Sequence, residues 1–286
     1  MPEPALREVR CLSPAGFHKM RYTEWGDPAN PRVLVCGHGL TRTGRDFDRL
    51  ARRLAPRMRV VCPDVVGRGA SEWLRDPRFY QVPQYAADMV VLLAALEAQE
   101  VNWLGTSLGG LIGMSLAGMP GTPIVRLILN DIGPRLEFVA LQRIAAYVGA
   151  GPRFESLEQA VAYNRSIAAG FSLRTDEDWR EATASVLRPE GTGYKLHYDP
   201  KIAVVMRMMS EEALQAGQEQ AWELYDSIAC PTLLLRGGNS DLLSASTAAE
   251  MCTRGPRPRL VTFEGVGHAP MFFDEEQIRV VADFLG

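Results

Sequence analysis

The sequence has little of what marks nucleic-acid-binding or membrane-spanning proteins. Lys and Arg number 31 against 34 Asp and Glu, a formal net charge of −3 over 286 residues, and no basic block occurs. A nucleic-acid footprint is therefore not expected. The longest apolar run, residues 89–96, is far shorter than the roughly 20 residues that a membrane-spanning helix needs. We expect a protein with neither nucleic-acid nor membrane partners.

Cysteine and histidine are also scarce and scattered. The five cysteines form no C-x-x-C pair, and the four histidines lie far apart in the sequence, so no structural metal site is expected. An odd set of cysteines inside or beside apolar runs is typical of free thiols in a reducing compartment. The N-terminal MPEPALREVR contains two glutamates and no apolar segment, unlike a signal peptide. These patterns together predict a cytoplasmic protein.

Short apolar segments alternate with amphipathic ones along most of the chain. This alternation indicates right-handed crossovers and a mostly parallel sheet that helices cover on both faces, and so predicts an α/β fold. A further antiparallel strand is expected at 22–25. The predicted strands are 33–36, 60–62, 101–104, 124–130, 232–236 and 260–263, and the predicted helices are 44–55, 83–98, 108–119, 246–253 and 275–285.

One interval departs from this alternation. Residues 134–210 contain no strong strand pattern and are predicted to form helices at 136–148, 156–169 and 176–187. A longer helix at 211–228 is expected to lead back to the sheet. The sequence therefore predicts a core made of residues 1–133 and 211–286, with residues 134–210 inserted as a helical lid.

A glycine-framed serine directly follows the predicted strand 101–104. The segment Gly105-Thr106-Ser107-Leu108-Gly109 fits the pattern G-x-S-x-G in the strand–turn–helix context that this motif requires. The glycines permit a sharp turn that exposes the serine hydroxyl, and the helix that follows directs its positive N-terminal end at the site. Ser107 is therefore the predicted nucleophile.

A serine hydroxyl needs a base to take its proton, and the base needs an acid to hold it. His268 lies just beyond the last predicted strand, at the edge where α/β sheets bind ligands, and is the predicted base. Two carboxylates fit the order of nucleophile, acid and base along the chain. Asp241, in the loop after strand 232–236, is favoured, and Asp131, at the end of strand 124–130, stays as the alternative.

Acyl chemistry also needs donors for a developing oxyanion. The backbone N–H of Leu108, next to the nucleophile, is one predicted donor. The backbone N–H of Leu40, in the loop Gly37-His38-Gly39-Leu40, is the other. His38 is expected to brace this loop through hydrogen bonds.

Taken together, these segments resemble the α/β-hydrolase superfamily over nearly the whole chain. The resemblance implies an eight-stranded, mostly parallel sheet, a helical lid, a serine triad and no cofactor. Ser107 stands where haloalkane dehalogenases and epoxide hydrolases of this superfamily have aspartate, which sets those branches aside. The segments that carry the resemblance are residues 37–40, 64–71, 105–110, 240–241 and 267–268.

The predicted function is hydrolysis of a carboxylic ester or lactone of a small, largely apolar substrate through an acyl-enzyme, by a monomer or homodimer. Hydrolases of short hydroxyacid oligomers are one candidate branch. A small-molecule receptor on the same fold, a carbon–carbon bond hydrolase and an aminopeptidase stay open as alternatives. Arg135 and Arg207 are candidates for contact with a substrate carboxylate. The predicted substrate pocket consists of His38, Phe138, Tyr147, Met206, Met209 and Pro270.

Overall fold

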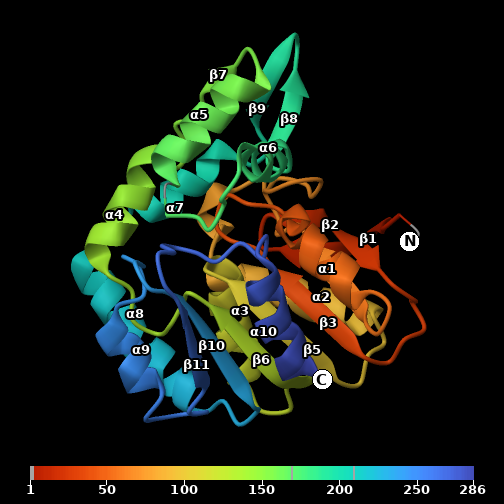
Figure 1. Cartoon of the computed structure of the whole chain (residues 1–286), viewed down its shortest axis with the longest axis vertical. Helices are drawn as coiled ribbons and strands as arrows, with labels where there is room; N and C mark the ends of the chain where they lie inside the picture. Colours follow the sequence, from red (N-terminus) through yellow and green to blue (C-terminus); the bar gives the residue numbers. More distant parts are fainter. Residues whose placement is uncertain (1–2, 169, 209) are drawn as a thin grey trace.

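An eight-stranded sheet runs through the centre of the computed structural model (Figure 1), which describes residues 3–168, 170–208 and 210–286. The strands lie in the order β1-β2-β4-β3-β5-β6-β10-β11. The pairs β1–β2 and β2–β4 are antiparallel, and all pairs from β4 to β11 are parallel. The mostly parallel sheet expected from the sequence is confirmed. The strands are β1 Ala5–Ser13, β2 Gly16–Trp25, β3 Val33–Gly37, β4 Arg59–Pro63, β5 Val101–Thr106, β6 Ile124–Asn130, β10 Thr232–Gly237 and β11 Arg259–Phe263.

Helices cover both faces of this sheet, because alternate strand residues point to opposite sides. In β3, Val33 and Val35 join the apolar cluster that includes residues of α2 and α3, whereas Leu34 and Cys36 join the cluster that includes residues of α1 and α10. Both faces are therefore buried, as the apolar strands predict. The helices outside the segment between β6 and β10 are α1 Asp48–Leu54, α2 Val82–Ala95, α3 Leu108–Ala117, α9 Ala245–Met251 and α10 Glu275–Leu285, with short 3₁₀ turns at η1 Gly44–Phe47 and η2 Pro77–Phe79.

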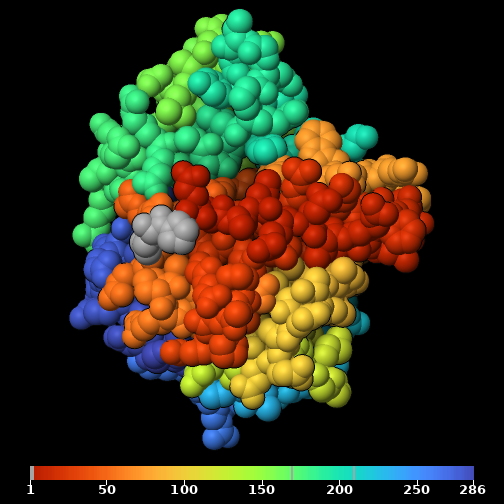
Figure 2. Space-filling model, turned by 90° about the vertical axis from the view of Figure 1, so that its right-hand side faces the viewer, coloured from red at the N-terminus to blue at the C-terminus, as the bar shows by residue number. Residues whose placement is uncertain are grey.

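A long segment separates β6 from β10, although these two strands are neighbours in the sheet. Its elements from α4 to α7 lie beyond one end of the sheet, in the upper part of Figure 1, whereas α8 lies lower, next to α9. Figure 2 shows the upper elements in green to teal above the red N-terminal hairpin. The limits predicted for a separate lid, residues 134–210, stay a prediction. The elements are α4 Phe138–Tyr147, β7 Arg153–Phe154, α5 Leu157–Ile167, α6 Asp176–Ala184, β8 Leu187–Glu190, β9 Gly193–Leu196, η3 Pro200–Ile202, α7 Ala203–Arg207 and α8 Glu211–Asp226.

The prediction that this segment contains no strand is wrong, because β7, β9 and β8 form a three-stranded sheet in that order. The strands have two to four residues, too few for an alternating pattern to be recognised. In β8, Arg188 and Pro189 interrupt any apolar run. The predicted helix 156–169 is α5, which ends at Ile167, and residue 169 lies outside the described residues.

Helix α3 starts directly against β3 and β5, and two glycines make this close approach possible. A Cβ atom on Gly109 would lie 2.0 Å from the carbonyl oxygen of Gly37, and one on Gly105 would lie 2.2 Å from the carbonyl oxygen of Gly109. Both contacts involve backbone atoms, which cannot rotate away as a side chain can. The glycines that frame Ser107 are thus required by packing as well as by the turn.

We predict that Gly109→Ala lowers the free energy of unfolding by at least about 2 kcal/mol, because the added methyl group must push α3 away from β3. Gly217→Ala is the matched control. Gly217 lies within α8, and a Cβ atom there would meet nothing within 4 Å, so alanine should raise stability by up to about 1 kcal/mol through its better helix propensity. Urea unfolding followed by circular dichroism measures both. Unchanged stability of Gly109→Ala would contradict the packing argument.

Candidate active site

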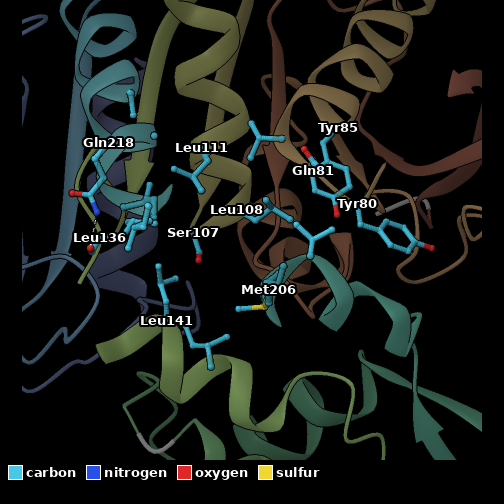
Figure 3. A pocket seen from close by; sticks show the side chains of 18 of the residues that line it. Tyr80, Gln81, Tyr85, Ser107, Leu108, Leu111, Leu136, Leu141, Met206 and Gln218 are labelled. Carbon is cyan, nitrogen blue, oxygen red and sulfur yellow. Dashed lines mark hydrogen bonds between the residues drawn. The ribbon is translucent and has the colours of Figure 1, made fainter. Parts of the chain in front are cut away.

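Ser107 occupies the sharp turn between β5 and α3. Its backbone has φ of 52° and ψ of −114°, a region that non-glycine residues rarely adopt and that is associated with functional sites. The carbonyl oxygen of Ser107 accepts the amides of Gly110 and Leu111 in the first turn of α3, and its own amide donates to the carbonyl oxygen of Asn130. The hydroxyl points into a cavity (Figure 3). The exposed serine expected from the motif is therefore present.

Asn130 links the serine turn to the loop that carries His268. Its side-chain amide donates to Thr106 Oγ1 at 2.9 Å and to the carbonyl oxygen of Pro270 at 2.8 Å. Because its backbone carbonyl oxygen also accepts the Ser107 amide, this one buried residue joins the serine turn with the residues next to His268.

The imidazole of His268 is held by Asp131. The distance between His268 Nδ1 and Asp131 Oδ2 is 2.7 Å. Asp131 directly follows β6, is fully buried, and also accepts from the Gly237 amide at 2.8 Å and from the Ser240 hydroxyl at 2.6 Å. Three donors thus satisfy a carboxylate that has lost its water, as a buried charge requires. With Nδ1 donating to Asp131, the other ring nitrogen, Nε2, is left with a free lone pair.

The prediction that Asp241 holds His268 is wrong, and the alternative, Asp131, makes the contact. The side chain of Asp241 is 49% exposed and forms an ion pair with Arg143 of α4, with Nε to Oδ2 at 2.8 Å. The loop after β10 turns tightly, since the Ser240 amide donates to the carbonyl oxygen of Gly237. This turn directs the Ser240 side chain inward onto Asp131 and leaves Asp241 at the surface.

The loop after β3 lies beside Ser107 and is braced from beneath by His38. His38 Nδ1 donates to the carbonyl oxygen of Gly39 at 2.7 Å, and Nε2 accepts from the Val65 amide at 2.9 Å. Within the described residues, the amides of Leu40 and Leu108 donate to no protein acceptor. His38 is fully buried and has the bracing position expected, but it does not line the cavity.

The cavity over Ser107 has a volume of about 540 Å³, within the range of sites for small organic ligands. Its wall carries no charged side chain within the described part of the chain, and the polar groups other than Ser107 are Tyr80, Gln81, Tyr85 and Gln218 (Figure 3). The apolar lining comes mainly from α3, from the segment between β6 and β10, and from the start of α2. It includes Leu40, Val82, Leu108, Leu111, Ile132, Leu136, Leu141, Ile144, Ile202, Val205, Met206, Met208, Leu214 and Leu242.

Of the predicted pocket residues that the structure describes, only Met206 is found in this lining. Phe138 and Tyr147 form the two ends of α4, whereas its middle faces the cavity. Pro270 contributes its carbonyl oxygen to Asn130 and not to the lining, and Met209 lies outside the described residues. Neither Arg135 nor Arg207 lines the cavity.

Sequence reasoning missed the contribution of Tyr80 and Tyr85 to this cavity. Tyr80 directly follows the turn η2 and Tyr85 lies in the first turn of α2, both after β4, so their proximity to Ser107 depends on tertiary structure. The one local signal was the pair of tyrosines around Pro83, at the beginning of a helix.

A group of buried potential metal ligands lies elsewhere, between the β1–β2 hairpin and α2. Ligand atoms of Cys11, His18 and Asp88 lie within 4.8 Å of one another, and His18 Nε2 is 3.0 Å from Asp88 Oδ2. Burial raises the pKa of the Cys11 thiol to about 12, which opposes formation of the thiolate that a metal needs. The His18–Asp88 pair ties the hairpin to the helix.

No helix in the described residues is long and apolar enough to span a bilayer.

Comparison with known proteins identifies the family. A model of the Alpha/beta hydrolase family matches residues 33–284. The chain is 52% identical over 286 residues to the 3-hydroxybutyrate-oligomer hydrolase of Cupriavidus necator, a match that covers 99% of this chain and 98% of the relative. The chain belongs to the alpha/beta hydrolase family. The resemblance found in the sequence is thus confirmed, and the expected class of enzyme, a hydrolase, is confirmed with it.

Two further proteins are similar to this alpha/beta hydrolase. The crystal structure of an alpha/beta hydrolase from Novosphingobium aromaticivorans matches with a TM-score of 0.87 at 36% identity, covering 100% of this chain and 99% of that chain. The 2-(acetamidomethylene)succinate hydrolase of Mesorhizobium japonicum is 25% identical over 238 residues, which covers 82% of this chain and 81% of the relative.

Exchange of each aspartate for asparagine separates their roles. We predict that Asp131→Asn lowers kcat by about 10³–10⁴-fold, because an amide that donates to Nδ1 leaves Nε2 protonated and removes the charge that balances the imidazolium. Asp241→Asn should change kcat less than about twofold, because it affects only an exposed ion pair. Both variants are assayed with 4-nitrophenyl butyrate at one pH, with folding checked by circular dichroism. A mild Asp131→Asn and a severe Asp241→Asn would restore Asp241 as the acid.

The buried His38 should make stability depend on pH. Burial, as the largest cause, lowers the pKa of His38 to about 3, whereas an unfolded histidine titrates near 6.5. Below about pH 6.5 the unfolded state therefore binds more protons than the folded state, and the free energy of unfolding falls by up to about 1.4 kcal/mol per pH unit. Above about pH 6.5 the neutral His38 is favoured in both states, and its contribution to the free energy of unfolding is fully present.

We predict that His38→Asn loses this part of the pH dependence. The free energy of unfolding is measured at pH 7 and at pH 5 for wild type and variant, which gives the decrease between the two pH values for each protein. Subtracting one decrease from the other cancels the contributions of all titrating groups that the two proteins share. Equal drops in wild type and His38→Asn would contradict the prediction.

Proposed function

We propose that the chain is a serine hydrolase that cleaves the carboxylic ester bonds of short hydroxyacid oligomers. Ser107 is the nucleophile, His268 the general base and acid, and Asp131 the acid that orients it. The observation that carries the proposal is the 2.7 Å hydrogen bond between His268 Nδ1 and the buried Asp131, next to a serine held in a strained turn over a cavity.

The proposed reaction has two proton-coupled halves. Asp131 accepts from His268 Nδ1, so that Nε2 takes the Ser107 proton as Oγ attacks the ester carbonyl carbon. The carbonyl oxygen becomes an oxyanion that the Leu40 and Leu108 amides stabilise, aided by the N-terminal end of α3. His268 then gives its proton to the leaving alcohol, and the acyl group stays on Ser107. In the second half, water attacks the acyl carbon while His268 takes its proton. The bond to Ser107 Oγ then breaks, His268 returns the proton to Ser107, and the acid is released.

The substrate class is supported by two observations. The 52% identical relative is named a 3-hydroxybutyrate-oligomer hydrolase, and the similarity extends over both chains. The cavity is apolar and carries no charged side chain among the described residues, which suits an uncharged chain with short methyl branches. A cavity of about 540 Å³ suits a small substrate better than a polymer.

Other candidates fit this site less well. A succinate-type substrate, as the name of the 25% identical relative describes for that protein, carries two carboxylates, which would need cationic partners in a cavity whose described wall has none. A receptor on the same fold has no need for a base held by a buried carboxylate. Lactones and activated carbon–carbon bonds are compatible with the same serine and enter the test as substrates.

We predict that Ser107→Ala loses hydrolysis of 3-hydroxybutyrate dimers and trimers by on the order of 10³-fold or more, because the covalent route disappears. Ser115→Ala in α3 is the matched control. The Ser115 hydroxyl donates to the Leu111 carbonyl oxygen within the same helix, so this variant should keep its activity. Product acid is titrated for oligomers, lactones and 4-nitrophenyl esters in parallel. A stoichiometric burst without turnover in wild type would favour the receptor, and an active Ser107→Ala would exclude the serine mechanism.

A further inference from the structure

Apart from Ser107, one hydroxyl group in the described cavity wall has a hydrogen without a protein acceptor. Tyr80 and Tyr85 both line the cavity. The Tyr80 hydroxyl donates to Asp199 Oδ2 at 2.8 Å and accepts from the Leu74 amide at 2.9 Å, which satisfies it. The Tyr85 hydroxyl accepts from Arg68 Nη1 at 2.9 Å but donates to none of the described residues. Because Tyr85 lines the cavity and no described residue accepts this hydrogen, a molecule bound in the cavity is a source of the acceptor.

The group that donates to the Tyr85 hydroxyl is a buried cation, the guanidinium of Arg68. Arg68 is fully buried, and no carboxylate of the described residues forms an ion pair with it. Its Nε donates to the carbonyl oxygen of Leu40 at 2.7 Å and its Nη1 to that of Val66 at 2.8 Å, whereas Nη2 has no partner. A positive charge that donates to the Tyr85 oxygen makes the hydroxyl a stronger donor. Burial raises the pKa of Tyr85 more than Arg68 lowers it, so the hydroxyl keeps its hydrogen at neutral pH.

The cavity lies on the acyl side of the scissile bond. In the proposed reaction His268 must give a proton to the leaving-group oxygen, so the alcohol has to lie toward His268. The cavity is lined by Ser107, Leu40 and Leu108 but not by His268. The part of the substrate that fills it is therefore the acyl chain, and Tyr85 faces that chain from the α2 side (Figure 3).

We propose that the Tyr85 hydroxyl, backed by Arg68, is a polar subsite that binds an uncharged acceptor oxygen of the acyl chain, namely the ester carbonyl of the next hydroxyacid unit. This inference rests on the proposed function and adds to it the group that distinguishes an oxygenated acyl chain from a hydrocarbon chain of the same shape. A hydrocarbon chain would leave the Tyr85 hydrogen without an acceptor, which disfavours its binding.

The test compares two esters with one leaving group. In 4-nitrophenyl 3-acetoxybutyrate the acyl chain carries the internal ester, and in 4-nitrophenyl 3-methylhexanoate two methylene groups replace its oxygen and carbonyl. Tyr85→Phe should lower kcat/KM about tenfold for the first ester and change it less than about twofold for the second. Arg68 Nη1 keeps its bond to the Val66 carbonyl oxygen in this variant, so folding is expected to survive, and thermal unfolding checks it.

Tyr80→Phe is the matched control, because its hydroxyl is already satisfied by protein. It should leave the ratio of kcat/KM between the two esters unchanged. If wild type hydrolyses both esters but Tyr85→Phe lowers both equally or neither, the subsite is overturned and the serine hydrolase stands. If wild type hydrolyses neither ester, the proposed function fails, and this inference fails with it.

Discussion

The buried carboxylate of Asp131 is the constraint on which the site depends. A charge with no exposure to water needs several donors, and they come from three parts of the chain: the end of β10, the loop after it, and the loop after β11. Each donor is brought to the same edge of the sheet because β6 and β10 are parallel neighbours. Satisfying the carboxylate therefore fixes the orientation of His268 relative to the sheet.

Asn130 extends the same constraint to the nucleophile. Its place beside Thr106 in the β5–β6 register puts its carbonyl oxygen next to the Ser107 amide and its side chain next to the His268 loop. Two consecutive residues at the end of β6 thus hold both loops. On the other side, Arg68 holds the Leu40 carbonyl oxygen while Gly105 and Gly109 let α3 approach the sheet. The serine turn is fixed from both sides before any substrate arrives.

The sequence allowed Ser107, His268 and the sheet to be predicted because their signals are local. The serine lies inside a five-residue pattern between a strand and a helix, and the strands are apolar runs long enough to recognise. The acid could not be chosen locally, since both Asp131 and Asp241 follow strands in the required order. The choice depends on which way the turn after β10 directs its side chains, and there Ser240, not Asp241, faces inward.

The segment between β6 and β10 was harder to predict for a related reason. Its short strands pair between positions that lie far apart in the sequence, as Arg153 does with Lys195. Such pairing produces no alternating hydrophobic pattern that could be recognised in the sequence. The segment is tied to the core by polar contacts: Arg42 Nη2 donates to the Ala182 carbonyl oxygen at 2.9 Å and Thr43 Oγ1 to that of Ser185 at 3.0 Å. These donors are supplied by the residues that follow Leu40, so the same loop lies beside Ser107 and contacts the segment between β6 and β10.

The charge distribution of the cavity also bears on how an oligomer would lie in it. A hydroxyacid oligomer is uncharged except for the carboxylate at one end, and in a scissile ester this end belongs to the alcohol side. Burying a carboxylate without a cationic partner would cost several kcal/mol, and the described wall of the cavity offers no such partner. If the proposed substrate class is right, the uncharged, hydroxyl-terminated part of the oligomer is therefore the part that would enter, and the carboxylate would stay on the side of His268. An enzyme of this design would release monomers or short acids from the alcohol side, while the apolar wall and the Tyr85 hydroxyl hold what remains on Ser107.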